Sequence, residues 1–379
     1  MGERSAITTK AVATAFRSSP SVLVLADDMT GALEVGARFS AAGIGAVVST
    51  KVLHSSTAQV IVYDTETRHV SPADAAEVIH RLIGAAISCS DGTMPFSAVY
   101  KKTDSTLRGN IATELKALSD LFPDWRIGYA PAYPSQGRTV RGGVLYVDGI
   151  EVAQSSFGRD LLSPVSVSDI RSMLAGEFDC TIFNGELDSH VDEAAHTILS
   201  DPSMRILAGP AALAGAYANL LAQKPASERM ASAPLPAISS CLVMNGSRHE
   251  RSIAQMRHRQ MPAGWKLIEM SHEPGAEPDH VAQANAEFLL KKIADCDPDA
   301  VFVMGGATVY ALIAALGHPT LWPIHEIVHG VPIARVDRAE TNVVLPQRTR
   351  DLFLISKAGG FGELDVLQSV HSALTHHGA

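Results

Sequence analysis

The stretch Val22-Leu23-Val24-Leu25-Ala26-Asp27-Asp28-Met29-Thr30-Gly31-Ala32 runs from an apolar segment into two acidic residues and a helix start. A short apolar run of this kind predicts a strand that is buried inside a parallel sheet. Ligands of open α/β sheets bind at the carboxyl ends of such strands. The stretch therefore predicts either a ligand site that contains Asp27 and Asp28 or a plain turn in which both residues only cap the helix.

The order of strand, polar loop and helix recurs along the chain. Further strands are predicted at 46–48, 60–63, 98–100, 127–130, 180–183, 205–208, 241–244, 300–304 and 352–357, with 22–48 as one βαβ unit and a hairpin at 144–150. Residues 222–239 mix proline, alanine and serine without periodicity. The pattern predicts two α/β domains with mainly parallel sheets. We expect an N-terminal domain at 1–225, a linker at 226–239, a C-terminal domain at 240–379 and a frayed tail over the first twenty residues.

Composition narrows the class of protein. Of the 379 residues 46% are hydrophobic, and the formal charge of -9 lacks the basic footprint that nucleic-acid binding requires. No apolar run approaches the length of a membrane span. The four cysteines lie far apart without a CxxC pair, which is typical of a reducing cytosol. We therefore expect a cytoplasmic protein with small-molecule ligands, no nucleic-acid partner and no membrane contact.

Two kinds of loop carry candidate chemistry. Residues 101–110 combine cations, an aspartate and hydroxyl side chains, a set that suits either a small polyhydroxylated anion or a solvated loop; Arg68 has the same two interpretations. Loops at 246–247, 305–308 and 358–362 place glycines after strands, where backbone N–H groups can hold phosphates. Neither a GxxxxGK[ST] loop nor a complete GxGxxG is present.

His325-Glu326-Ile327-Val328-His329 spells HExxH, a zinc-protease pattern that needs both histidines on one helical face. Pro323 and Gly330-Val331-Pro332 leave room for barely one helical turn. We therefore assign no metal-binding residues, and a zinc-dependent hydrolase that uses His325, Glu326 and His329 is kept as an alternative.

Five motifs, in this order, resemble the four-carbon acid sugar kinase family. They are Ala26-Asp27-Asp28-Met29-Thr30-Gly31-Ala32, the run from Lys102 to Asn110, Ala130-Pro131-Ala132-Tyr133-Pro134 with Gln136-Gly137-Arg138-Thr139, Gly305-Gly306-Ala307-Thr308, and Lys357 to Gly362. The resemblance implies a sugar-acid-binding N-terminal domain, an ATP-binding C-terminal domain and an active site in the interdomain cleft. It further implies phosphorylation of the 4-hydroxyl of an acid such as D-threonate, D-erythronate or 3-oxo-tetronate.

The resemblance also distributes the candidate site residues. The substrate side receives Asp27, Asp28, Arg68, Lys102, Thr103, Asp104, Ser105 and Arg108; the ATP side receives Ser247, His249, Gly305, Gly306, Ala307, Thr308, Lys357, Gly359 and Gly360. We expect Asp28 to accept or orient the hydroxyl proton, with Asp104 and Asp27 as rivals, and Mg²⁺ to bridge phosphate oxygens. Lys357 could add a positive charge for a phosphate.

Two residues depart from the family pattern. Ala307 stands where the family has an acidic residue, and His249 stands where it has a hydroxyl. Both departures bear on the expected nucleotide contacts. A non-catalytic sugar-acid-binding protein is a second alternative, and a homodimer is one assembly that the sequence allows.

Overall fold

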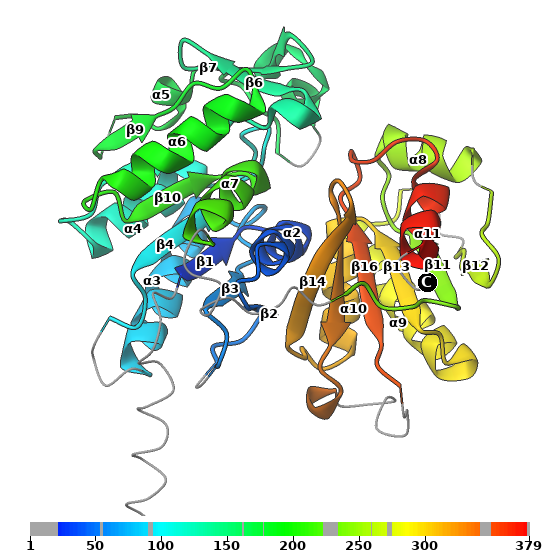
Figure 1. Ribbon diagram of the computed structural model, residues 1–379. Helices are drawn as coiled ribbons and strands as arrows, with labels where there is room; N and C mark the ends of the chain where they lie inside the picture. Colours follow the sequence, from blue (N-terminus) through cyan, green and yellow to red (C-terminus); the bar gives the residue numbers. More distant parts are fainter. Residues whose placement is uncertain are drawn as a thin grey trace, which may run out of the picture. The chain divides into compact units, whose positions relative to one another are not determined.

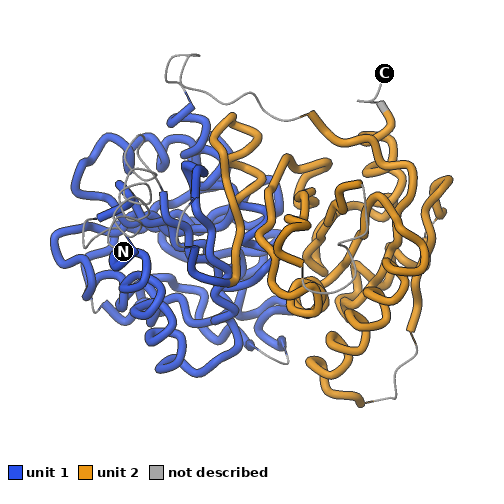
Figure 2. The backbone as a smooth tube through the Cα atoms, turned by 90° about the horizontal axis from the view of Figure 1, so that it is seen from below, with its two compact units in different colours: residues 1–35, 51–229 blue, residues 36–50, 230–379 orange. Residues whose placement is uncertain are grey.

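The computed structural model describes residues 22–53, 56–89, 94–160, 163–176, 178–222, 234–258, 260–270, 275–341 and 350–376. The chain divides into two compact units (Figure 2): unit 1 comprises 1–35 and 51–229, and unit 2 comprises 36–50 and 230–379. This division differs from the predicted one in segment 36–50, which belongs to unit 2. The boundary crosses helix α2 (Met29–Ala41), so no break in the sequence pattern marks it. The predicted tail and most of the predicted linker lie outside the described residues.

Unit 1 is built on a parallel sheet with the strand order β3-β1-β4-β10-β5-β9 (Figure 1). Its strands are β1 (Val22–Ala26), β3 (Val60–Asp64), β4 (Ala98–Lys102), β5 (Ile127–Tyr129), β9 (Cys180–Ile182) and β10 (Ile206–Gly209). Every residue of β1, β3 and β4 is buried, as expected for strands that helices cover on both faces. The strands predicted in these places are confirmed.

Helices cover both faces of this sheet. On one face lie α3 (Pro72–Ser88) and α4 (Ile111–Leu121), and on the other lie α6 (Asp188–Ser200) and α7 (Ala211–Leu221) (Figure 1). Helix α3 begins as its sequence predicts, because the Ser71 side chain accepts the N–H of Asp74 and Pro72 occupies the first turn. The short helix α5 (Ile170–Met173) precedes β9.

A small antiparallel sheet is inserted after β5. It consists of β6 (Arg138–Arg141), β7 (Val144–Val147) and β8 (Ile150–Glu151). The turn between β7 and β8 is Asp148-Gly149, and both residues have positive φ values of 49° and 82°. This is the backbone that a two-residue hairpin turn requires, so the predicted hairpin is confirmed.

Strand β2 (Ala46–Ser49) lies in the predicted place after β1 and α2, but it does not pair directly with β1. Strand β1 pairs with β3 and β4, whereas β2 pairs antiparallel with β14 (Leu321–Val328), where Leu321 lies opposite Val48. The sequence did not predict this partner, because a strand almost 300 residues away along the chain cannot be read from local periodicity.

Unit 2 contains parallel strands in the order β12-β11-β13-β16, followed by antiparallel β15 and β14. The remaining bounds are β11 (Cys241–Asn245), β12 (Trp265–Leu267), β13 (Ala300–Met304), β15 (Val331–Val336), β16 (Phe353–Lys357), α8 (Glu250–Arg257), α9 (Pro278–Cys296), α10 (Gly306–Ala315) and α11 (Val366–His376). Met256 of α8 and Val370 of α11 join Val243 and Phe302 of the strands in one apolar core. This core fixes the strand ends that carry the glycine-containing loops.

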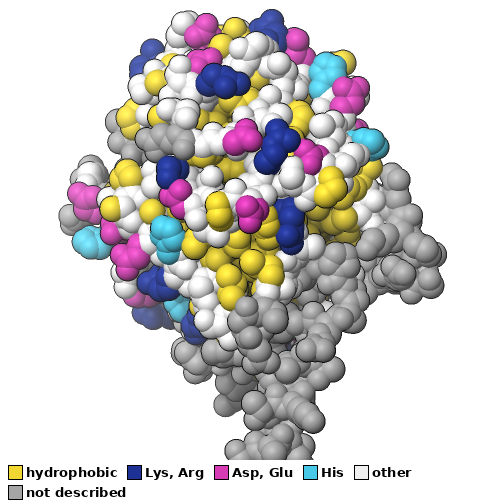
Figure 3. All heavy atoms as spheres, turned by 90° about the vertical axis from the view of Figure 1, so that its left-hand side faces the viewer, with side chains coloured by type: hydrophobic (Ala, Val, Ile, Leu, Met, Phe, Trp, Pro, Cys, Tyr) yellow, Lys and Arg dark blue, Asp and Glu magenta, His cyan; other side chains and the backbone are white. Residues whose placement is uncertain are grey.

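In the described part of the chain, no helix combines the length and apolar character needed to cross a bilayer. On the face of the molecule shown in Figure 3, Lys and Arg side chains are interspersed with Asp and Glu side chains and do not gather into one basic patch.

Candidate functional site

The carboxyl ends of the unit 1 strands bring the predicted substrate residues to one edge of the sheet. Asp64 of β3 lies opposite Ala26 of β1, Ala26 opposite Lys102 of β4, and Lys102 opposite Gly209 of β10. The loops that follow β1, β3 and β4 therefore leave the sheet from a single row. The row brings together the predicted residues Asp27, Asp28, Arg68, Lys102, Thr103, Asp104, Ser105 and Arg108.

Arg68 joins the loops after β3 and β1. Its Nε donates to Asp27 Oδ2 at 2.7 Å and its Nη2 to Asp27 Oδ1 at 2.9 Å, which is a bidentate pair. Its Nη1 donates to Asp28 Oδ2 at 2.9 Å. Burial lowers the pKa of Arg68, but Asp27 and Asp28 outweigh burial and hold the pKa well above its ordinary value. The guanidinium therefore stays charged and ties the two acidic residues in place.

Asp28 is surrounded by hydrogen-bond donors. Its Oδ2 accepts the Thr30 hydroxyl at 2.7 Å, and its Oδ1 accepts the N–H of Gly31 at 3.0 Å. Burial raises the pKa of Asp28, but the charges of Arg68 and Lys102 bring the pKa down to about 2. Asp28 is therefore a carboxylate at every physiological pH, and it is suited to orient a hydroxyl group more than to remove its proton.

Asp104 forms a second bidentate pair, with Arg108. Arg108 Nη2 lies 2.8 Å from Asp104 Oδ1 and Nε lies 3.0 Å from Oδ2. Burial raises the pKa of Asp104, but Arg108 and Arg68 bring it well below its ordinary value. The Arg108 guanidinium also lies 5.3 Å from the centre of the Phe157 ring, and its side chain is 25% exposed compared with 11% for Arg68. Arg108 is thus the more accessible of the two arginines.

Lys102, Thr103 and Ser105 complete the edge, and all three are buried. Lys102 Nζ donates to the carbonyl of Thr103 at 2.9 Å. A Cβ placed on Gly31 would lie 2.7 Å from Lys102 Nζ and 2.6 Å from Asp28 Oδ1. Glycine is required at position 31 because the ammonium and the carboxylate both pack against its backbone.

Two carboxyl groups at this edge were not among the predicted site residues, Asp64 and Glu66. Asp64 is the last residue of β3, its Oδ1 accepts the N–H of Glu66 at 3.3 Å, and Glu66 Oε1 accepts the N–H of Met29 at 3.1 Å. Burial, followed by the neighbouring acidic groups, raises the pKa of Asp64 well above its ordinary value and that of Glu66 to about 7. The sequence signal was present, since both residues follow a predicted strand just before Arg68.

Glu66→Gln is expected to flatten the pH dependence of stability. The folded state keeps on Glu66 a proton that the unfolded chain releases near pH 4.5, so the free energy of unfolding falls as pH rises from about 4.5 to about 7. Thermal melts at constant ionic strength over this range should show that loss in the wild-type protein and a smaller loss in the variant. Glu77→Gln, on the exposed face of α3, is the matched control. Parallel curves for wild type and Glu66→Gln would contradict the raised pKa.

Unit 2 repeats the arrangement with different chemistry. Asn245 of β11 lies opposite Met304 of β13, and Met304 lies opposite Lys357 of β16, so three loops again leave one row. Their glycines are in close contact with neighbouring loops: a Cβ on Gly359 would lie 2.3 Å from Ser247 Oγ, and a Cβ on Gly305 would lie 3.1 Å from the Ser247 nitrogen. The structure therefore brings the predicted residues Ser247, His249, Gly305, Gly306, Thr308, Gly359 and Gly360 to one edge.

His249 takes over a capping function at this edge. It is the N-cap of α8, and its Nδ1 accepts the N–H of Arg251 at 3.1 Å. A Ser, Thr, Asp or Asn oxygen is the usual acceptor at such a position, and here the imidazole nitrogen takes its place. Ala307, the other departure, is exposed in the first turn of α10, whereas Thr308 is buried against Gly246.

Lys357, which the family resemblance assigns to the ATP side, is not a solvated strand-end lysine. Its side chain is buried, and its Nζ donates to Ser252 Oγ at 3.1 Å and to the carbonyls of Ala358 and Phe361 at 2.9 and 3.0 Å. Burial, followed by the charge of Arg251, lowers the pKa of Lys357 to about 7. In this structure the ammonium shapes the glycine-rich loop from inside.

Gln255 was also not among the predicted site residues. Its Nε2 donates to the carbonyls of Phe361 and Gly362 at 3.0 and 2.9 Å. Ser252 Oγ donates to the Gly359 carbonyl at 2.8 Å. Both residues lie on helix α8, whose N-cap is His249, so their spacing from His249 along the helix was the signal that could have found them. Helix α8 and Lys357 together fix the loop from residue 358 to 362.

The HExxH segment is not helical. His325, Glu326 and Ile327 lie in strand β14, and His329 follows the strand. Arg38 Nη2 lies 2.8 Å from Glu326 Oε2 and 3.0 Å from His329 Nδ1. Two of the three side chains of the expected zinc motif are therefore engaged by a guanidinium. Among the described residues, no group of three or more His, Cys, Asp or Glu side chains is placed to hold a metal ion. The structural premise of the zinc-hydrolase alternative was therefore wrong.

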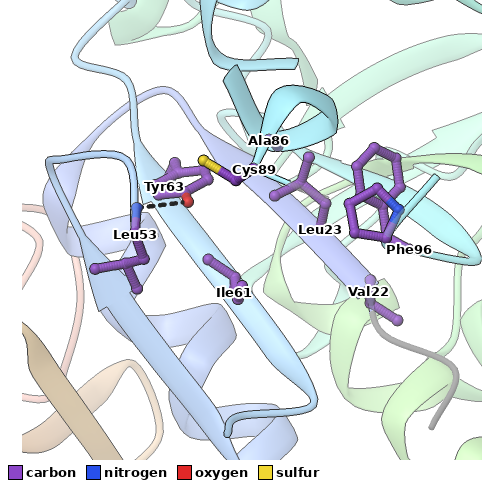
Figure 4. A pocket seen from close by; sticks show the side chains of 9 residues that line it. Val22, Leu23, Leu53, Ile61, Tyr63, Ala86, Cys89 and Phe96 are labelled. Atoms are coloured by element: carbon purple, nitrogen blue, oxygen red, sulfur yellow. Dashed lines mark hydrogen bonds between the residues drawn. The ribbon is translucent and has the colours of Figure 1, made fainter. Parts of the chain in front are cut away.

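Unit 1 also contains an apolar pocket at the opposite ends of its strands. Val22 and Leu23 at the start of β1, Ile61 of β3 and Phe96 line it, and the Tyr63 hydroxyl accepts the N–H of Leu53 at 3.0 Å (Figure 4). No charged side chain lines this pocket. It is therefore unsuited to a sugar acid or a phosphate.

The fold and the two strand edges define a two-domain α/β protein with candidate ligand sites at the carboxyl ends of parallel strands. A family model described as the sugar-binding N-terminal domain matches residues 22–225. The chain belongs to this family, the four-carbon acid sugar kinases.

Curated relatives agree with this assignment. The D-threonate kinase of Bordetella bronchiseptica is 26% identical over 92% of this chain and 96% of its own length. The D-threonate kinase of Salmonella typhimurium is 32% identical over 43% of this chain and 38% of its own length. Other relatives are named D-erythronate kinase and 3-oxo-tetronate kinase. A crystal structure from Salmonella typhimurium LT2 shares the fold, with a TM-score of 0.73, 17% identity and coverage of 93% of this chain and 98% of the other.

Proposed function

We propose that this chain is an ATP-dependent kinase that phosphorylates the 4-hydroxyl of a four-carbon sugar acid of the D-threonate, D-erythronate or 3-oxo-tetronate type. The observation that carries the proposal is the likeness to a D-threonate kinase over 92% of the chain, since it spans both units and thus both strand edges. The chemistry of the two edges supports it independently.

The unit 1 edge suits a small polyhydroxylated anion. The carboxylates of Asp27, Asp28 and Asp104 balance the charges of Arg68, Lys102 and Arg108, so these side chains carry no net charge before a ligand binds. Arg108, the more exposed arginine, is placed to receive the substrate carboxylate, with Arg68 and Lys102 as its neighbours. Asp28 is the group that would orient the reacting hydroxyl.

The unit 2 edge suits a polyphosphate. At Gly305, Gly359 and Gly360 a side chain would fill space next to Ser247 and His249, so glycine lets these loops lie close together. The Gly305 N–H itself donates to the Lys357 carbonyl at 2.9 Å, so we assign the phosphate contacts to the N–H groups of Gly359, Gly360 and the first turn of α10. Helix α10 begins at Gly306 and adds its positive dipole end. Mg²⁺ would be carried by the phosphate oxygens of the nucleotide and would neutralise their charge. Lys357 and Gln255 hold the shape of the loop.

In-line transfer of a phosphoryl group requires the protein mainly to position the reactants and to neutralise charge. The acceptor hydroxyl must meet the γ-phosphoryl group in the correct line, and the developing charge must be neutralised. Asp28, ionised at neutral pH, fulfils the first requirement by holding the hydroxyl through one hydrogen bond. The glycine-lined N–H groups fulfil the second.

A coupled assay of ADP release over a panel of four-carbon acids tests the proposal. We expect ADP release that depends on one acid of the panel, with phosphate on its 4-hydroxyl by ³¹P and ¹H NMR of the product. Tight binding of an acid by calorimetry without ADP release would favour the non-catalytic binding protein instead. ADP release that does not need an acid would indicate an ATPase. A homodimer stays a prediction, which light scattering of the purified protein tests.

A further inference from the structure

The last two residues of β4 send their side chains to opposite faces of the unit 1 sheet. Lys102 Nζ lies next to Gly31 of α2, at the candidate substrate edge. Lys101 Nζ lies on the other face and forms an ion pair with Glu114 Oε1 of α4 at 3.0 Å. Neither side chain of this pair is more than 1% exposed. The attraction within a buried ion pair often does not exceed the free energy needed to remove both charges from water. A gain in stability alone therefore does not explain this pair.

The same Glu114 oxygen also holds the loop after β3. Glu114 Oε1 accepts the hydroxyl of Thr67, which is fully buried. The hydroxyls of Thr67 and Thr65 lie 2.6 Å apart, and Thr65 donates to the carbonyl of Ala26 at 2.8 Å. Each hydroxyl has one proton, and Glu114 and Ala26 accept the two, so Thr67 and Thr65 meet in a close contact between these two hydrogen bonds. The contacts together connect helix α4 to the residue immediately before Asp27.

The loop from residue 65 to 68 needs such support. Glu66 has a φ of 47°, a conformation that costs free energy for a residue other than glycine. Asn110 Nδ2 donates to the carbonyls of Thr67 and Val70 at 2.8 and 3.0 Å, so the loop is held on both sides of Arg68. The position of the Arg68 guanidinium therefore depends on groups buried behind the sheet.

We propose that Lys101, Glu114 and Thr67 form a positioning network that fixes Arg68 against Asp27 and thereby sets the affinity of the unit 1 edge for its acid substrate. None of the three touches the edge itself; they act through the loop that carries Arg68. The identity of the ligand in this proposal rests on the function proposed above, whereas the effect on Arg68 does not.

Thr67→Val and Thr67→Ser together test whether the Thr67 hydroxyl positions Arg68 or whether the side chain only fills space. Valine keeps the shape of threonine but removes the hydroxyl that donates to Glu114, whereas serine keeps the hydroxyl. We expect Thr67→Val to raise the KM for the sugar acid about tenfold, to leave the KM for ATP unchanged, and Thr67→Ser to restore the wild-type value. Thr197→Val is the matched control, because its hydroxyl donates to the Glu193 carbonyl on the exposed side of α6.

A second variant removes the charges without leaving either one unpaired. Lys101→Met with Glu114→Leu replaces the ion pair by apolar side chains of similar volume, a change that often leaves stability unchanged or raises it. We expect a melting temperature no lower than that of the wild type and a raised KM for the acid. An unchanged KM in this double variant and in Thr67→Val would overturn the proposal; if the double variant fails to fold, Thr67→Val decides.

The outcome can be distinguished from a failure of the proposed function. If the wild-type protein releases no ADP with any acid, the proposed function fails, and a crystal structure of Thr67→Val then tests the network alone. The network predicts that the Arg68–Asp27 contacts, now 2.7 and 2.9 Å, are lost or lengthened in that variant. Intact contacts at these distances would overturn the network whatever the ligand.

Discussion

Asp28→Asn is expected to lower the rate of phosphoryl transfer by about a hundredfold or more while the affinity for ATP stays unchanged. The change keeps the size of the side chain but removes the charge that faces Arg68, at 2.9 Å, and Lys102. It also replaces one acceptor oxygen by a donor NH₂ group, which cannot hold a hydroxyl that must give up its proton. Steady-state kinetics with the best acid of the panel and calorimetry with a non-hydrolysable ATP analogue give the two quantities.

The control is Asp120→Asn in the same unit, since Asp120 is 56% exposed and pairs with Lys116 one helical turn away. An equal loss of transfer and of ATP binding in Asp28→Asn would show that Asp28 is structural. Full activity in Asp28→Asn, together with a large loss in Asp27→Asn or Asp104→Asn, would transfer the hydroxyl-orienting role to one of these rivals.

Gly305→Ala is expected to have the opposite effect, raising the KM for ATP about tenfold or more while the affinity for the sugar acid stays unchanged. Gly305 has a φ of 107°, which a residue with a Cβ rarely adopts, and the added Cβ would lie 3.1 Å from the Ser247 nitrogen. The strain falls on the start of α10, whose N–H groups are proposed to hold a phosphate. Calorimetry with the ATP analogue and with the acid gives both affinities.

Gly84→Ala is the matched control for this substitution. Gly84 lies inside helix α3, and an added Cβ would meet no atom within 4 Å. Alanine there should raise stability by about 0.5–1 kcal/mol and change neither affinity. If Gly305→Ala binds the ATP analogue as tightly as the wild type and melts at the same temperature, the loop after β13 is not part of the nucleotide site.

The sequence groups the candidate residues at common strand edges because their motifs directly follow strands. Val22 to Ala26 and Ala98 to Lys102 are apolar runs long enough to be recognised, and parallel strands must end at one edge of the sheet. Asp27, Asp28, Arg68 and the loop after Lys102 could therefore be brought together before any coordinates were known. The same reasoning placed the glycines of unit 2 on one edge.

Other features depend on contacts that local patterns do not encode. The pairing of β2 with β14 joins residues far apart in the chain, so the sequence did not predict it. The HExxH segment lies largely in strand β14, which pairs antiparallel with β15 (Val331–Val336). The turn at Gly330 between two apolar runs could have suggested this hairpin from the sequence. The burial of Lys357, and with it the bond to Ser252 on helix α8, is a tertiary property that local sequence does not encode.

The acidic residues after β3 show a further limit. Asp64 and Glu66 stand in a polar segment that the sequence assigns to the strand end, but their raised pKa values arise from burial beside Asp28. Whether a polar group at a strand end is buried depends on the helices that pack over it. Here the N-terminus of α2 covers the strand end, and the Met29 N–H donates to Glu66 Oε1. Periodicity alone gives no measure of that burial.

Transfer of ³²P from [γ-³²P]ATP by the purified protein tests the central claim most directly. The protein is incubated with D-threonate, D-erythronate or 3-oxo-tetronate, and the labelled products are separated by charge. We expect the label to appear in the phosphorylated acid with one of the three, and to be lost with Asp28→Asn. Label that appears only in inorganic phosphate, or that remains in ATP with every acid, would contradict the account.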